Sequence, residues 1–225
     1  MLKKSIKKDG LIFNLNDESR TASIKRLDGI FDSIEIPRSI NFQSSEYVIK
    51  NIMPLTFYEG YDSKRRVKSV SFAKDSEISI FSSKSFYFSS IESLSLPASL
   101  EHLENGWCQE TKFLTKISIS PRNKKFIYND EKMILGKSNE FDENYDTIYF
   151  TRRDIKEVQI PSFIKYINSS AFDSCEKLKK IVIHEDSELL SIENNAFASS
   201  SIDSFFIPSK LMKIATDWQG KQAKS

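Results

Sequence analysis

The sequence is poor in the residues that build most chemical sites. It has 6 glycines, 2 cysteines and 2 histidines among 225 residues. So few glycines leave little material for a loop that cradles phosphate groups, and Cys108 and Cys175 are too few to form a disulfide framework. Neither His102 nor His184 has other ligand-type residues at metal-ligand spacing. We therefore expect no catalytic residue, no cofactor and no metal site.

Long apolar runs and an excess of one charge are also missing. No run approaches the roughly 18 residues of a membrane-spanning helix, and the first ten residues lack the apolar centre of a signal peptide. The net charge of +2 gives no general attraction to nucleic acid or to an anionic membrane. The basic cluster at 64–66 is balanced by Glu59 and Asp62, which favours a solvated loop. The sequence predicts neither a nucleic-acid partner nor a transmembrane segment.

What the chain does contain is a short phrase that recurs along it. The clearest copy is Ile155-Lys-Glu-Val158-Gln-Ile160-Pro161, whose alternation is typical of a half-buried strand. Pro161 ends that strand because proline has no N–H to donate to a ladder. Four of the six intervals between copies are 23 or 24 residues (94 to 117, for example), within the roughly 20–29 residues of leucine-rich repeats. The central residues of the seven copies are Ile34, Val70, Leu94, Ile117, Val158, Ile181 and Phe205.

The two longer intervals, of 36 and 41 residues, contain insertions that are typical of hairpins, near 40–50 and 121–150. A hairpin at 11–24 precedes the repeats and covers the open face of the first coil. The expected organisation is one structural unit: an N-terminal hairpin cap at 1–28, about seven repeats at 29–215, and a polar tail at 216–225. After most strands a second apolar segment ends in an aromatic residue, which the coil would bury.

This phrase, followed by Ala171-Phe172-Asp-Ser-Cys175-Glu-Lys-Leu178, resembles the BspA-like leucine-rich repeat family over most of residues 9–215. The resemblance implies a leucine-rich-repeat solenoid, a right-handed strand-and-coil superhelix that is strand-rich with short helical or 3-10 turns. It also implies adhesion or protein binding, often on cell surfaces of microbes and protozoan parasites. A cell-surface location is implied by this resemblance alone. Cys175 occupies a repeat slot, where we expect a buried small hydrophobe.

The strands also predict a contact surface. In each phrase the flanking apolar residues point inward, so the middle residue points to the outer, concave side of the sheet. That column is polar in the first five copies but contains Val182 and Phe206 in the last two. We expect a partner contact around this pair. The alternatives are that the C-terminal tail covers it or that the apolar pair is incidental. The candidate residues are Glu157, Gln159, Lys180, Val182 and Phe206.

The sequence thus favours a non-catalytic binding module that presents its strand face and hairpin insertions to a protein or a glycan. The alternative is a self-assembling structural surface component, so self-association remains open. An enzyme is disfavoured because no site is visible. Asn168-Ser-Ser170 matches a glycosylation acceptor, but it also lies in the polar turn of a repeat, where the same residues are favoured anyway. The identity of the partner is not determined by the sequence.

Overall fold

The structure is a computed structural model that describes residues 4–60, 67–139, 141 and 143–220. The basic cluster at 64–66 and the end of the expected tail lie outside these residues. The described residues form strands and turns, without a helix among them. The chain divides into two compact units, Met1–Lys124 and Lys125–Ser225, where the sequence predicts one. Among the described residues, each sheet lies wholly within one unit.

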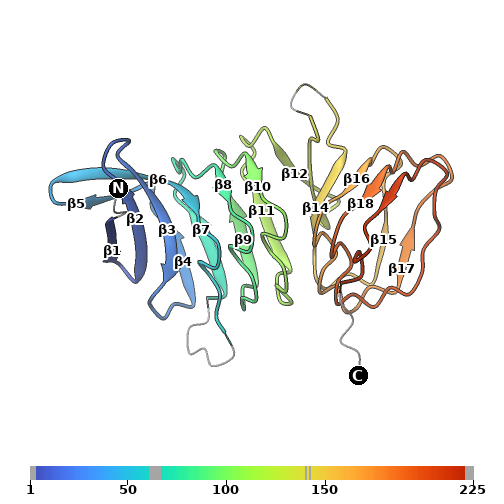
Figure 1. The fold of residues 1–225 in the computed structure, drawn as a ribbon, viewed down its shortest axis with the longest axis horizontal. Coiled ribbons are helices and arrows are strands. Elements are labelled where there is room, and N and C mark those ends of the chain that lie inside the picture. Colours follow the sequence, from blue (N-terminus) through green and yellow to red (C-terminus); the bar gives the residue numbers. More distant parts are fainter. Residues whose placement is uncertain (1–3, 61–66, 140, 142, 221–225) are drawn as a thin grey trace. The chain divides into compact units, whose positions relative to one another are not determined.

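The first unit begins with an antiparallel sheet (Figure 1). Three strands follow one another: β1 (Lys4–Lys8), β2 (Leu11–Asn16) and β3 (Thr21–Leu27). Alternate residues of β2 are buried, beginning at Leu11, because side chains of a strand point to opposite faces. β6 (Ser45–Ile52) then pairs parallel with β3 and antiparallel with β5 (Ser39–Phe42). The strand β1 has no counterpart in the sequence prediction.

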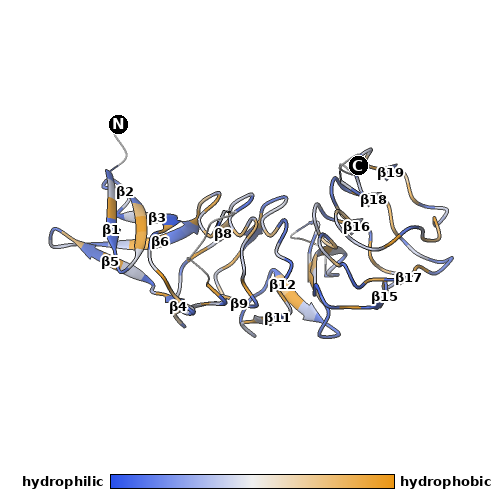
Figure 2. Cartoon of the chain, turned by 90° about the horizontal axis from the view of Figure 1, so that it is seen from below, coloured by the Kyte–Doolittle hydropathy of each residue, from blue (hydrophilic) through white to orange (hydrophobic). Residues whose placement is uncertain are grey.

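The following coils of the first unit add strands to two sheets. The first four copies of the phrase form a parallel sheet of β4 (Ser33–Ile36), β7 (Ser69–Phe72), β9 (Ser93–Leu96) and β11 (Lys116–Ile119). On the opposite side of the coils, β8 (Ile80–Phe81) and β10 (His102–Leu103) extend the N-terminal sheet from β6 (Figure 2). The coils are therefore closed by two short strands rather than by helices.

The second unit repeats this plan after a new start. β12 (Phe126–Asn129), β13 (Met133–Gly136) and β14 (Thr147–Thr151) form an antiparallel sheet. β16 (Tyr166–Ile167), β18 (Ser191–Ile192) and β19 (Lys213–Ile214) extend that sheet in parallel. The fifth and sixth copies of the phrase form a separate pair, β15 (Glu157–Gln159) and β17 (Lys180–Val182) (Figure 2).

The seventh copy, at 202–208, is not a strand, and on this point the sequence prediction is wrong. The preceding Ser201 instead bonds to the coil before it, donating its N–H to Cys175 O at 3.4 Å and its hydroxyl to Glu176 O at 2.5 Å. The Phe205 ring packs on Phe197 and Trp218, with centroids 5.8 and 5.4 Å apart. These contacts compete with a regular ladder on β17. Trp218 is therefore half-buried within the region expected to be a polar tail.

Both units are filled by aromatic columns, as the sequence predicts. Phe57 and Phe86 stack with centroids 4.7 Å apart in the first unit, and Phe172 and Phe197 stack at 4.8 Å in the second. Cys175 is fully buried, which confirms its predicted role as a small hydrophobe. Burial raises the pKa of its thiol to about 11.

Candidate functional site

Four of the five predicted contact residues lie on one surface of the second unit. Glu157 pairs with Lys180, and Gln159 pairs with Val182, in the register of β15 and β17. The residues between them point inward, while Glu157, Gln159 and Lys180 are exposed and Val182 is half-buried. The Nε2 atom of Gln159 lies 2.9 Å from Nε2 of His184. We call this set of four residues the β15–β17 face.

The fifth predicted residue, Phe206, lies outside the ladder. Its side chain is 50% exposed, as the prediction requires. The next residue, Ile207, was expected to point inward but is 61% exposed, because 202–208 does not follow the strand alternation. Sequence reasoning therefore missed Ile207. The run Phe205-Phe206-Ile207 did not indicate it, because strand alternation places Phe205 and Ile207 on one side and Phe206 on the other.

Among the described residues, β17 pairs with β15 and with no other strand, so its outer edge is unpaired. Within the part of the chain that the structure describes, residues 202–207 donate no backbone hydrogen bond to β17. β15 and β17 form a parallel sheet of two strands. An unpaired edge presents backbone N–H and C=O groups that can bond to another extended chain. The unpaired edge lies beside the β15–β17 face, because Lys180 and Val182 of that face also belong to β17.

The corresponding surface of the first unit has a different character. Its outward residues are mainly serines, and the Ser118 hydroxyl donates to Ser95 Oγ at 2.7 Å. None of these outward residues is apolar, so the surface resembles the small, polar face that the sequence predicts. The residues are Ser33, Glu35, Ser69, Ser71, Ser93, Ser95, Lys116 and Ser118.

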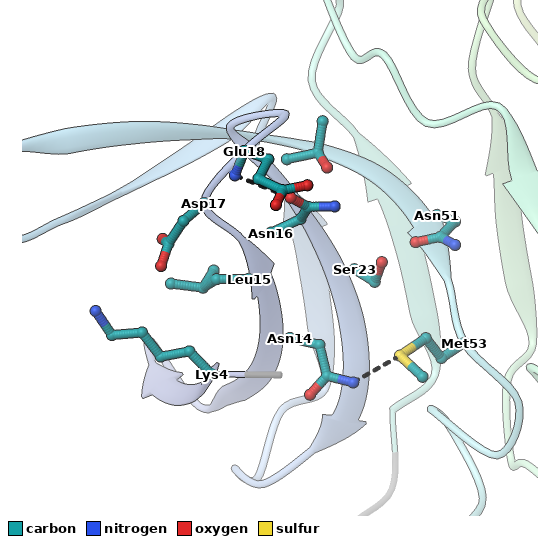
Figure 3. A pocket seen from close by; sticks show the side chains of 10 residues that line it. Lys4, Asn14, Leu15, Asn16, Asp17, Glu18, Ser23, Asn51 and Met53 are labelled. Atoms are coloured by element: carbon teal, nitrogen blue, oxygen red, sulfur yellow. Dashed lines mark hydrogen bonds between the residues drawn. The ribbon is translucent and has the colours of Figure 1, made fainter. Parts of the chain in front are cut away.

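A pocket of about 400 Å³ opens on the N-terminal sheet of the first unit (Figure 3). The floor is a row of Asn14, Ser23 and Asn51, which are paired in register on β2, β3 and β6. Asp17 and Glu18 stand at the turn after β2. The sequence analysis did not assign this pocket. Asparagines within strands were the available signal, because strands are poor in asparagine.

Hydrogen bonds fix part of the pocket wall. Asn14 accepts a bond from the Ser5 hydroxyl at 2.6 Å, and its Nδ2 donates to Met53 Sδ at 3.3 Å. Asp17 accepts a bond from the Tyr47 hydroxyl, and this bond raises the pKa of the Tyr47 phenol. The Oδ1 atom of Asn51 is buried and has no hydrogen-bond partner among the described residues.

Other chemical classes of site find no support in the described residues. No cluster of three or more His, Cys, Asp or Glu side chains is arranged there to hold a metal ion. The described ranges also contain no helix that is both long enough and apolar enough to cross a membrane.

Each coil contains about one copy of the strand phrase, and the strands of successive coils form two sheets around a column of aromatic side chains. This arrangement defines a leucine-rich-repeat solenoid. The model of the BspA-type leucine-rich repeat region matches residues 23–130 and 139–218 in six copies. The chain belongs to this family. Its repeat fold is typically non-catalytic. No curated protein matches the sequence.

A solved structure agrees on the fold. A leucine-rich cell surface protein from Faecalibacterium prausnitzii matches with a TM-score of 0.52 and 14% identity, over 96% of this chain and 86% of that protein. At this identity the likeness establishes the fold alone. The pneumococcal vaccine antigen PcpA is also similar, with a TM-score of 0.41 and 13% identity, over 94% of this chain and 78% of that one.

Proposed function

We propose that this protein is a non-catalytic binding module of a cell surface, which adheres to a protein partner through the β15–β17 face. The observation that carries the proposal is the combination of exposed side chains and an unpaired edge on the same strand, β17. A partner that adds an extended segment to this edge would gain backbone hydrogen bonds. The neighbouring side chains would then supply specificity.

The side chains of this face fit a peptide of mixed character. Glu157 and Lys180 offer opposite charges one strand apart, whereas Val182 and the exposed Phe206 offer apolar surface. Aromatic residues contribute much of the energy at protein interfaces. We infer that Phe206 is the apolar anchor and that the charged pair selects among partners. The surface location is supported by the similarity to the leucine-rich cell surface protein from Faecalibacterium prausnitzii.

Selection from a displayed random-peptide library tests this function. The intact chain should enrich peptides, and those peptides should bind at least about tenfold more weakly to Val182→Ser/Phe206→Ser, since 1.4 kcal/mol of lost contact is a tenfold change. Phe113→Ser is the matched control, because Phe113 is also an exposed phenylalanine but lies in the first unit. Equal binding by the double variant and the intact chain would eliminate the β15–β17 face as the binding surface.

The second candidate function, a self-assembling surface component, rests on the same unpaired edge, because edge strands also pair with copies of themselves. Sedimentation velocity over a wide concentration range separates the two. A monomer at all concentrations supports recognition of a different partner. Concentration-dependent assembly that Val182→Ser/Phe206→Ser abolishes supports self-assembly.

A further inference from the structure

The pocket on the N-terminal sheet is separate from the β15–β17 face and belongs to the first unit. Its floor places an amide, a hydroxyl and a second amide in line, from Asn14 to Ser23 to Asn51. Neighbouring strands lie about 4.8 Å apart, so the three polar groups are evenly spaced. Figure 3 shows Asn14, Ser23 and Asn51 along the same face of the sheet.

One amide of the floor has hydrogen-bonding capacity left over. The Asn14 amide donates to the sulfur of Met53 at 3.3 Å, and a thioether is a weak acceptor. The floor therefore offers one poorly used donor, and the Ser23 hydroxyl beside it can both donate and accept.

The rim and the size of the pocket limit the class of ligand. A volume of about 400 Å³ lies in the range of small-molecule sites, roughly 300–1,000 Å³. Asp17 and Glu18 add two carboxylates, which disfavour a phosphate or another anion. The rim cation, Lys4, already donates to Gln43 Oε1 at 2.9 Å. The ligand should therefore be uncharged or cationic.

The mixture of donors and acceptors decides between these two. An alkyl amine has only donors to offer, so it would leave the Asn14 N–H unused. A sugar hydroxyl both donates and accepts, and neighbouring hydroxyls on one ring can reach neighbouring groups on the floor. We propose that this pocket binds one neutral pyranose residue, free or at the end of a glycan. Asn14 Nδ2 donates to one hydroxyl, and the Asp17 and Glu18 carboxylates accept from other hydroxyls at the rim.

The experiment uses the intact chain and methyl glycosides of glucose, galactose, mannose and N-acetylglucosamine as probes. Saturation-transfer NMR detects binding, and titration calorimetry measures its strength. At least one glycoside should bind. Asn14→Ala should weaken that binding about tenfold, the effect of losing one hydrogen bond of about 1.4 kcal/mol.

The matched control is Asn41→Ala, because Asn41 is an exposed asparagine on β5 and does not line the pocket. Its affinity for the glycoside should be unchanged. Thermal melting followed by circular dichroism checks that each variant is folded. If none of the glycosides binds, if Asn14→Ala binds as tightly as the intact chain, or if putrescine or inorganic phosphate binds in preference, the sugar site is refuted. The outcome is independent of Val182→Ser/Phe206→Ser, which changes residues of the second unit alone.

Discussion

The two units have nearly the same interior and different surfaces. In the first unit four copies of the repeat strand form one parallel sheet, and its outer face consists mainly of serines. In the second unit two copies pair and the next copy forms no strand; Val182 lies on the edge strand β17, and Phe206 and Ile207 of the next copy are exposed. The stacked phenylalanines are alike in both, at 4.7 and 4.8 Å. The repeat pattern therefore reports packing, and the departures from it mark the candidate surfaces.

Removing one stacked phenylalanine ring from each unit tests whether the two interiors are equivalent. Phe86 and Phe172 are both 0% exposed and each stacks on another buried phenylalanine. Phe86→Ala and Phe172→Ala should each lower the free energy of unfolding by about 3–5 kcal/mol, through lost contacts and a residual cavity. Urea denaturation followed by circular dichroism measures this. A cost below about 1 kcal/mol for either variant would show that the two interiors are not equivalent.

The second test uses the buried cysteine of the second unit. Burial raises the pKa of the Cys175 thiol to about 11 in the folded chain, compared with about 8.5 for a free cysteine. The unfolded chain therefore loses its proton first, and the stabilisation is complete below about pH 8.5 and is lost as pH rises toward about 11. The loss should reach about 3 kcal/mol at 1.36 kcal/mol per pKa unit.

The measurement compares urea denaturation of the intact chain with that of Cys175→Ala across this alkaline range. The alanine variant should be less stable at neutral pH, because it lacks buried side-chain volume. Its stability should fall less steeply with pH, because it lacks the titrating thiol. Parallel pH profiles for the two proteins would contradict the raised pKa.

Each unit contains a glycine whose substitution by alanine tests how closely side chains pack against the backbone. A Cβ at Gly136 would lie 2.6 Å from a ring carbon of Tyr149 and 2.9 Å from one of Phe126, so the rings must move. Gly136→Ala should cost about 1–3 kcal/mol. Gly10→Ala should cost at least as much, because Phe31 lies 2.4 Å away and φ is +73°. Thermal melting of both variants measures the costs, and an unchanged midpoint for Gly136→Ala would show that the rings yield freely.

Much of the fold could be predicted because burial imposes a period on the sequence. Val158 and Ile160 alternate with polar residues, and Phe172 recurs as Phe197 in the next coil, so strand and core positions are visible in the sequence. The two-residue strands on the other side, such as Ile80–Phe81, are too short to show a period. They form because the neighbouring coil supplies a partner, which a local pattern does not report.

The candidate sites were predictable only in part. Glu157 and Lys180 follow from alternation within regular strands. The exposure of Ile207 does not, because it depends on the packing of Phe205 against Trp218, a residue in the stretch read as a polar tail. The sugar pocket combines Asn14, Ser23 and Asn51 from three strands. Such a row exists only after the parallel pairing of β3 with β6 is known, so the sequence contains no local motif for it.

Exchanging an outward valine of the second unit and an outward serine of the first should change the free energy of unfolding least. Val182→Ser in the second unit and Ser95→Val in the first should each change the free energy of unfolding by less than about 0.5 kcal/mol, because both side chains lie on the solvent face. The direction should be opposite, since strands favour valine over serine. Urea denaturation midpoints measure the change. A cost above about 2 kcal/mol for Val182→Ser would mean that Val182 belongs to the core, and the β15–β17 face would then offer a partner no apolar side chain.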